Sequence, residues 1–197
     1  HWINKKKSWK IKFKQENLYK RKKSIDLIIP KERFMEVELT AYTIAKKYGL
    51  LVPDSSFILL EQNGKNMGLY FLKEKIDKYF LERNNYPIGE IFTGNDLGLQ
   101  NDQILDSTSS VNFYGLNAGS YKTQIEDSKE ISAVAISQWS KFLDILKTSN
   151  EDLINKNIKN YLDIEKFSMW NAIYLIFGNN HAQSINNIKW YYNPITG

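Results

Sequence analysis

The sequence predicts an α+β fold, with a sheet built mainly from the first 75 residues and helices dominating the rest. Short runs of strand-forming residues, one of them strictly alternating between apolar and polar, lie in that first part. Apolar residues recur at helical spacing over residues 33–48, 131–147 and 164–177. Hydrophobic residues make up 42% of the 197 residues, which is enough to bury a core.

The first two expected strands form a hairpin. Residues 8–14 alternate apolar side chains with Lys10 and Lys12, so both lysines project from one face. A second strand, 24–29, follows a charged turn and is closed by Pro30, because proline cannot continue a β-ladder.

The first expected helix spans residues 33–48 and ends before Gly49, a residue suited to a left-handed C-cap. Glu38 falls inside the apolar stripe of this helix. A charge in that position is costly unless it is paired, so we expect a cation on the adjoining sheet, either Lys12 or Lys10. A pair local to the helix, or a partly exposed Glu38, is the alternative.

Two further strands are expected at residues 57–60 and 68–72, joined by an Asn-Gly turn. The following segment, which begins at Glu74, is helical or irregular and leads away from the sheet. The expected organisation is therefore a sheet-plus-helix unit over 1–82 and an incomplete, mainly helical unit over 83–197.

The second unit begins with residues 84–128, which are rich in Gly, Asn, Ser and Asp and are expected to be loop with one short strand. The helix at 164–177 has Asp163 as its expected N-cap and stops at Gly178. A last strand is expected at 188–192.

Composition excludes several kinds of site and partner. The chain has no Cys and only two His, which rules out disulfides, thiol nucleophiles, thiolate zinc sites and histidine-rich metal sites. No run approaches the roughly 20 apolar residues of a membrane-spanning helix, so we expect no transmembrane segment. The net charge of +5 comes mostly from lysines in the first 23 residues. Such a cluster is typical of a surface that binds nucleic acid, an anionic surface or an acidic protein, and also of an edge strand protected by lysines. The sequence has no recognised nucleic-acid motif, so nucleic acid is not the partner we expect.

The polar segment 178–187 has the spacing of a kinase catalytic loop, in which an acidic base precedes a metal-binding asparagine by five positions. His181 and Asn186 are five positions apart, so the spacing matches while the first residue does not. Histidine accepts a proton near neutral pH but brings no negative charge. Kinases also hold nucleotide phosphates with a strand lysine paired to a helix glutamate, the arrangement expected for Glu38. Polar groups that merely cap a helix and a turn are the alternative for the loop.

Taken in order, several segments resemble the CotH protein kinases. They are Ser8–Phe13, Thr40–Tyr42 with Gly49–Pro53, Gly68–Asp77 and Gly178–Asn187. The pattern Gly-Leu-Tyr-x-x-x-Glu-x-Ile-Asp, within Gly68–Asp77, is the most specific of them. The resemblance runs from about residue 7 to residue 194 and is faint over 84–130.

This resemblance implies a two-lobed, atypical protein-kinase-like fold and a phosphotransferase activity. ATP, with Mg²⁺ or Mn²⁺, would be the cofactor, and serines or threonines of a spore-coat or surface protein would be the substrate. It also implies a spore-coat, secreted or cell-surface location.

The resemblance assigns site residues as well. Lys12 would contact the nucleotide phosphates, with Lys10 as the alternative, and Glu38 would be its helix partner. Glu74 would lie beside the adenine on the segment that links the lobes, and Asn186 would bind the metal.

One position departs from the family pattern, because His181 stands where the family has its catalytic aspartate. The phosphate-covering loop would precede residue 8, and a second metal-binding aspartate would follow Gly197, so we expect the chain to be part of a longer protein. A catalytically impaired pseudokinase that serves as a binding or structural module is the alternative function.

Overall fold

The structure is a computed structural model that describes residues 6–30, 34–93, 122–123, 132–148, 150–178 and 188–197. It confirms an α+β fold with antiparallel sheets and several helices. The chain divides into two compact units, His1–Asn85 with Met169–Phe177, and Tyr86–Ser168 with Gly178–Gly197. The lobe boundary expected near residue 82 stays a prediction.

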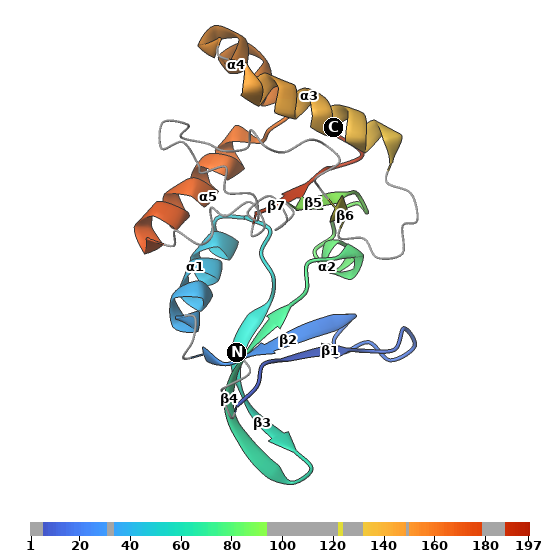
Figure 1. The fold of residues 1–197 in the computed structure, drawn as a ribbon, viewed down its shortest axis with the longest axis vertical. Helices are drawn as coiled ribbons and strands as arrows, with labels where there is room; N and C mark the ends of the chain where they lie inside the picture. The colour runs from blue at the N-terminus through green and yellow to red at the C-terminus, as the bar shows by residue number, and fades with distance from the viewer. Residues whose placement is uncertain (1–5, 31–33, 94–121, 124–131, 149, 179–187) are drawn as a thin grey trace, which may run out of the picture. The chain divides into compact units, whose positions relative to one another are not determined.

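The first unit contains a four-stranded antiparallel sheet (Figure 1). Its strands are β1 (Trp9–Lys12), β2 (Ser24–Ile28), β3 (Ser55–Gln62) and β4 (Lys65–Glu74), in the order β1-β2-β4-β3. All four predicted strands are present. The last two are longer than predicted because their polar ends continue the ladder beyond the apolar runs that mark them in the sequence.

Helix α1 spans Met35–Lys47, close to the predicted range. Gly49 follows the end of this helix, and its φ of 75° is the left-handed conformation expected of a glycine that closes a helix. The Gly49 N–H donates to the carbonyl of Lys46 at 3.1 Å, and the Leu50 N–H donates to that of Ala45 at 3.0 Å. These bonds satisfy carbonyls that the helix end would otherwise leave unpaired.

The two faces of the first sheet have different roles. Ile25, Leu27 and Tyr70 belong to a buried apolar cluster on one face. Because alternate residues of a strand point to opposite faces, Asp26 and Lys73, which are register partners on β2 and β4, lie on the other face. The latter is the face toward α1, since Lys73 contacts a side chain of that helix.

Helix α2 (Lys78–Arg83) follows β4 directly and corresponds to the segment expected to lead away from the sheet. The side chain of Asp77 caps it by accepting the N–H of Phe80 at 3.2 Å. Phe80 and Leu81 are 1% and 0% exposed, so this short helix is anchored by its apolar side.

The second unit contains a three-stranded antiparallel sheet in the order β6-β5-β7. Its elements are β5 (Ile91–Thr93), β6 (Lys122–Thr123), α3 (Ala133–Lys147), α4 (Glu151–Asn157), the 3-10 helix η5 (Ile158–Asn160) and β7 (Lys189–Tyr191). The predicted strand at 188–192 and helix at 131–147 are thereby confirmed. Helix α5 (Ile164–Phe177) has the predicted bounds, begins after Asp163 as predicted, and contributes residues to both units.

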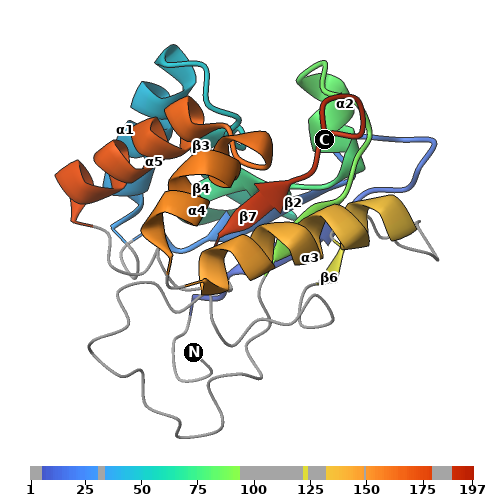
Figure 2. The ribbon, with the colours of Figure 1, turned by 90° about the horizontal axis from the view of Figure 1, so that it is seen from above.

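An aromatic cluster forms the core of the second unit, where α3 runs beside the sheet (Figure 2). Phe92 of β5 stacks on Trp139 of α3 with ring centroids 4.9 Å apart, and Trp190 of β7 lies 5.6 Å from Phe142. Aromatic stacking therefore joins α3 to the strands. At the edge of this cluster, Gly89 lies so close to the neighbouring backbone that a Cβ there would overlap the carbonyl of Tyr192.

No helix among the described residues has the length and apolar character needed to cross a membrane.

Candidate functional site

Glu38 of α1 is paired with Lys73 of β4. The Lys73 Nζ lies 2.6 Å from the Glu38 Oε1, and the two side chains are only 28% and 21% exposed in that order. Lys73 projects toward α1 because its strand neighbours Leu72 and Glu74 point to the opposite face. The charge inside the apolar stripe of α1 thus has a cation on the adjoining sheet, as its position requires.

The lysine in this pair differs from the predicted one. Lys12 and Lys10 lie on β1, which is separated from β4 by β2 in the sheet order. Neighbouring strands are about 4.8 Å apart, so β1 lies roughly 10 Å from β4. The structure therefore pairs Glu38 with Lys73, while Lys12 and Lys10 are exposed on the edge strand.

Tyr42 completes this group, which we term the Glu38–Lys73–Tyr42 cluster. Its hydroxyl donates to the Glu38 Oε1 at 2.7 Å, and the Lys73 Nζ lies 5.3 Å from its ring centroid. Burial raises the pKa of Tyr42 to about 12. Burial alone would lower the pKa of Lys73, but Tyr42 and Glu38 beside it outweigh that effect and raise it. At neutral pH the cluster therefore holds a fixed ammonium group and a protonated phenol.

A hollow of about 430 Å³ adjoins this cluster. It is lined by Tyr42, Thr43, Lys46 and Lys47 of α1 and by Ser55 of β3. The two lysines give it a positive lining, and Ser55 is the register partner of Lys73 across β3 and β4. An anionic group at this surface would meet basic side chains from the helix.

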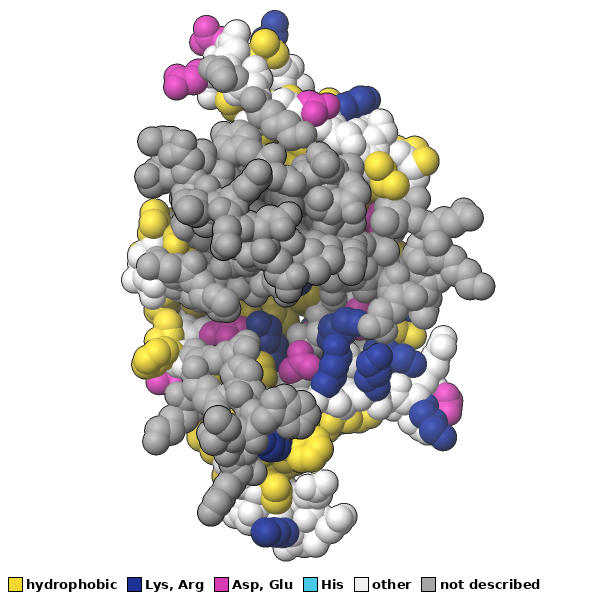
Figure 3. Space-filling view, in the orientation of Figure 1, with side chains coloured by type: hydrophobic (Ala, Val, Ile, Leu, Met, Phe, Trp, Pro, Cys, Tyr) yellow, Lys and Arg dark blue, Asp and Glu magenta, His cyan; other side chains and the backbone are white. Residues whose placement is uncertain are grey.

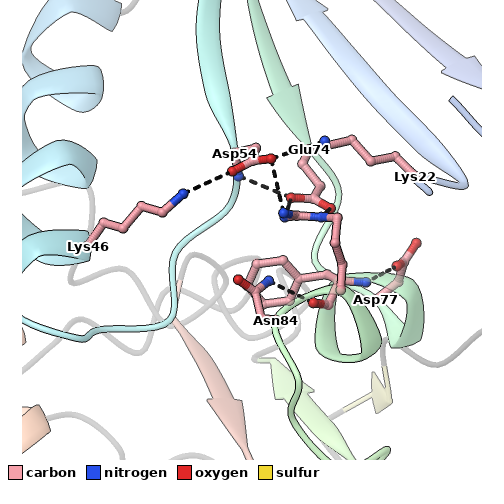
Figure 4. A network of polar contacts seen from close by, with 8 residues as sticks. Lys22, Lys46, Asp54, Glu74, Asp77 and Asn84 are labelled. Carbon is pink, nitrogen blue, oxygen red and sulfur yellow. Dashed lines mark hydrogen bonds and ion pairs between the residues drawn. The ribbon is translucent and has the colours of Figure 1, made fainter. Parts of the chain in front are cut away.

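A second polar network ties the ends of several elements together (Figure 4). Arg83 of α2 holds the carboxylate of Glu74 with two nitrogens, of which Nε lies 2.9 Å from Oε1. The Arg83 Nη1 also lies 3.1 Å from the Oδ2 of Asp54. Lys22 and Lys46 approach Asp54 at 3.1 and 3.4 Å. Residues before β2 and β3, the end of β4 and helix α2 are thereby joined.

Glu74 lies at the end of β4, on the segment that leaves the sheet, where the sequence placed it. Its side chain is 2% exposed. Besides Arg83, its carboxylate accepts the backbone N–H of Asp54 at 3.1 Å. This carboxylate therefore fixes the departure of the chain from β4 toward α2. A contact between Glu74 and adenine stays a prediction.

The predicted catalytic loop contributes no geometry. His181 and Asn186 lie in 179–187, outside the described residues, so their roles stay predictions. Within the described part of the chain, no three His, Asp or Glu side chains are grouped to hold a metal ion.

Comparison with known proteins identifies the family. Residues 2–196 match the family model described as CotH kinase protein. The chain belongs to the CotH family. It is also similar to the inner spore coat protein H of Bacillus subtilis (strain 168), with 23% identity over 199 residues that cover 98% of this chain and 51% of that protein. The chain thus spans about half the length of this curated relative.

Lys73, Asp54 and Arg83 are members of these polar groups that sequence reasoning did not assign to a site. Lys73 lies inside Gly68–Asp77, the segment with the most specific resemblance to the CotH family, and alternation with its apolar neighbours indicated its face. For Asp54 and Arg83 no such signal exists, because each lies outside the periodic part of an element. Their contacts depend on how the ends of strands and helices meet.

Proposed function

We propose that this chain forms part of an ATP-dependent protein phosphotransferase with the two-lobed arrangement of kinases. The observation that carries the proposal is the ion pair between Lys73 and Glu38. Kinases use a strand lysine held by a helix glutamate to position nucleotide phosphates. The order of elements supports the proposal too, since α1 comes between the second and third strands of an antiparallel sheet.

The chemistry of Lys73 suits this task. Its ammonium group has three donors, of which the Glu38 oxygen accepts one, and the side chain is 28% exposed. Because the cluster keeps Lys73 charged at neutral pH, it offers phosphate oxygens a cation whose position is already fixed. Lys12, with Lys10 as its alternative, stays a second candidate for the phosphate contact.

ATP, bound with Mg²⁺ or Mn²⁺, would supply the phosphoryl group. Transfer breaks the bond between the γ-phosphorus and the oxygen that leaves with ADP, and forms a bond to a serine or threonine oxygen of the substrate. His181 is the proposed acceptor of the hydroxyl proton, and Asn186 the proposed metal ligand. Because the B. subtilis relative is named as an inner spore coat protein, the proposed substrate is a coat or surface protein.

Nucleotide binding is the first test. ATP affinity of the full-length protein, with Mg²⁺ and with Mn²⁺, is compared with that of Lys73→Met, Glu38→Gln and Lys12→Met. Lys65→Met, at the exposed start of β4 and outside the lining of the hollow, is a matched control for the loss of one lysine. The proposal expects about tenfold or greater loss for Lys73→Met and Glu38→Gln in folded protein. Loss in Lys12→Met alone would move the phosphate contact to β1, and no binding by the wild-type protein would contradict the proposal.

His181 favours a second candidate, a pseudokinase that keeps the fold as a binding module. Phosphate transfer separates the two. Transfer of labelled γ-phosphate to a coat-protein serine by the wild-type protein supports the kinase. ATP binding without transfer, followed by a gain of transfer in His181→Asp, supports the pseudokinase.

A further inference from the structure

The chain from Lys10 to Lys23, which we term the basic arm, carries a dense positive charge. Six of its seven Lys and Arg residues (Lys10, Lys12, Lys14, Lys20, Arg21 and Lys23) are exposed or half-buried, while Lys22 is 6% exposed and paired with Asp54. Glu16 is the one acidic residue in the sequence of the basic arm. Figure 3 shows Lys and Arg side chains gathered over the β1–β2 hairpin.

Two of these basic residues occupy an unfavourable backbone conformation. Lys20 and Arg21 have φ values of 48° and 62°, in the left-handed region that residues with a Cβ avoid. Tyr19 and Lys22 flank them and exchange two backbone hydrogen bonds, of 3.2 and 2.8 Å. Lys20 and Arg21 are thus the central pair of a tight hairpin turn that normally takes Asn-Gly.

The same sheet contains the relaxed version of this turn. Asn63 and Gly64, between β3 and β4, have φ values of 51° and 74°, and both residue types tolerate that conformation. The β1–β2 turn instead places two long cations at its tip. Phe13 and Tyr19 stack with ring centroids 5.5 Å apart, which stiffens the arm behind that tip. The strain therefore holds two positive charges at a defined position.

The edge of β1 continues this charged surface. The Phe13 N–H donates to the Lys23 carbonyl at 2.9 Å, so these two residues form a hydrogen-bonded pair. Hydrogen-bonded and non-bonded pairs alternate along an antiparallel ladder, which turns the backbone N–H and C=O groups of Lys12 and Lys10 outward. Among the described strands, none pairs with this edge. Another extended polypeptide is the partner that matches such groups.

We propose that the basic arm binds an extended acidic polypeptide that adds a strand to the outer edge of β1. Side chains directly opposite in a ladder share a face, so its acidic residues lie at alternate positions opposite Lys10 and Lys12. Further carboxylates reach Lys20 and Arg21 at the tip. Nucleic acid or an anionic membrane matches the charge but not the backbone groups of β1. The proposal is independent of nucleotide binding and of phosphotransfer.

The test separates the effect of lost charge from the effect of lost folding. One double substitution is expected to weaken peptide binding while it makes the fold more stable. In the full-length protein, Lys20→Asn with Arg21→Gly relieves the strained turn and removes two charges. The expected result is a higher Tm together with about tenfold weaker binding of a labelled peptide that alternates Glu and Val, measured by fluorescence anisotropy. Lys65→Asn, which removes one exposed charge beside the relaxed turn, is the control and leaves peptide affinity unchanged.

Three probes then distinguish the partner. The same peptide with N-methylated backbone at alternate positions binds more weakly if it pairs with β1. Equal affinity for this peptide, or tighter binding of oligo-dT or of phosphatidylserine vesicles, overturns the proposal. Unchanged peptide affinity in Lys20→Asn with Arg21→Gly overturns it too, and leaves the lysines as protection of an edge strand.

Discussion

Lys73 and Tyr42 donate to the same oxygen, Oε1 of Glu38, at 2.6 and 2.7 Å. The Glu38 carboxylate therefore accepts hydrogen bonds both from β4 and from the next turn of its own helix, α1. Removing Glu38 would leave Lys73 charged and half-buried without its anion, whereas removing both partners would leave neither charge unpaired. The losses of stability in the two single variants should therefore add up to more than the loss in the double variant.

We expect Glu38→Gln and Lys73→Met each to lower the free energy of unfolding by about 2 kcal/mol, because each leaves the other partner in a poorly solvated place. The double variant should lose less than the sum by about 1–2 kcal/mol. Urea denaturation of the four proteins measures this coupling. Strictly additive losses would mean that the pair is not formed in solution.

The sequence predicts the elements of this fold where periodicity is strong. Helix α5 (Ile164–Phe177) has the expected bounds because an N-cap at Asp163 and a Gly at 178 delimit it. Helix α4 (Glu151–Asn157) was missed, since it has seven residues, too few for a helical period to stand out, and its capping residue Asn150 is equally typical of a turn.

The candidate site was predictable only in part. The helical projection of Glu38 predicted a cation on the sheet, and Lys73 supplies it. The identity of that cation depends on the strand order, which places β4 rather than β1 beside the helix. Alternation determines the face on which Lys12 or Lys73 projects but not its neighbours across the sheet, because strand pairing is a tertiary property.

Tyr42 should ionise only at strongly alkaline pH. Burial raises its pKa to about 12, and Glu38 beside it acts in the same direction. The raised pKa means that the folded state favours the protonated phenol, so this contribution to stability is present at neutral pH. It is lost as pH rises from the ordinary value of about 10 through 12.

Spectrophotometric titration at alkaline pH checks this behaviour. The difference between the wild-type protein and Tyr42→Phe should isolate one phenol that titrates near pH 12. A difference curve with a midpoint near 10 would show that Tyr42 is solvated. Tyr48, which is 63% exposed on the same helix, provides the matched control through Tyr48→Phe.

Asp77 caps α2 while largely buried. The capping hydrogen bond favours the ionised carboxylate, whereas burial disfavours it. Burial raises the pKa of its carboxyl, which the N–H of Phe80 only partly offsets. The ionised form is therefore disfavoured by folding, and this penalty grows as pH rises above the unfolded value of about 3.9 and is complete above the folded pKa. Asparagine keeps an oxygen that accepts from Phe80 without the charge.

We accordingly expect Asp77→Asn to be at least as stable as the wild-type protein at pH 7, and Asp77→Ala to lose about 1 kcal/mol through the missing cap. Any advantage of Asp77→Asn should shrink as acid protonates Asp77. Thermal or urea denaturation at pH 7 and pH 4 measures both effects. Equal losses in the two variants would mean that the charge itself is needed.

Asp54 should contribute to stability only above its acid transition. Burial tends to raise its pKa, but Lys22 and Arg83 outweigh this and hold the pKa below its usual range. A lowered pKa gives a stabilising contribution that is complete above the unfolded value of about 3.9 and is lost as pH falls through the folded value. Asp54→Asn should thus be less stable than the wild-type protein at pH 7. The gap should close below about pH 4, whereas a gap that is constant with pH would exclude an ionic role.

Arg83 and Lys46 allow a buried and an exposed ion pair to the same carboxylate, that of Asp54, to be compared for their contribution to stability. Both contact Asp54, but Arg83 is 17% exposed and also holds Glu74 with two nitrogens, while Lys46 is 67% exposed. Lysine cannot reproduce a two-nitrogen contact, so Arg83→Lys leaves a buried carboxylate poorly paired and should cost about 2 kcal/mol. Lys46→Gln should change stability by less than about 0.5 kcal/mol because exposed ion pairs contribute little. Urea denaturation at low salt and at 1 M NaCl measures both variants. Similar losses, both abolished by salt, would mean that Glu74 is solvated and that the network does not fix α2 to the sheet.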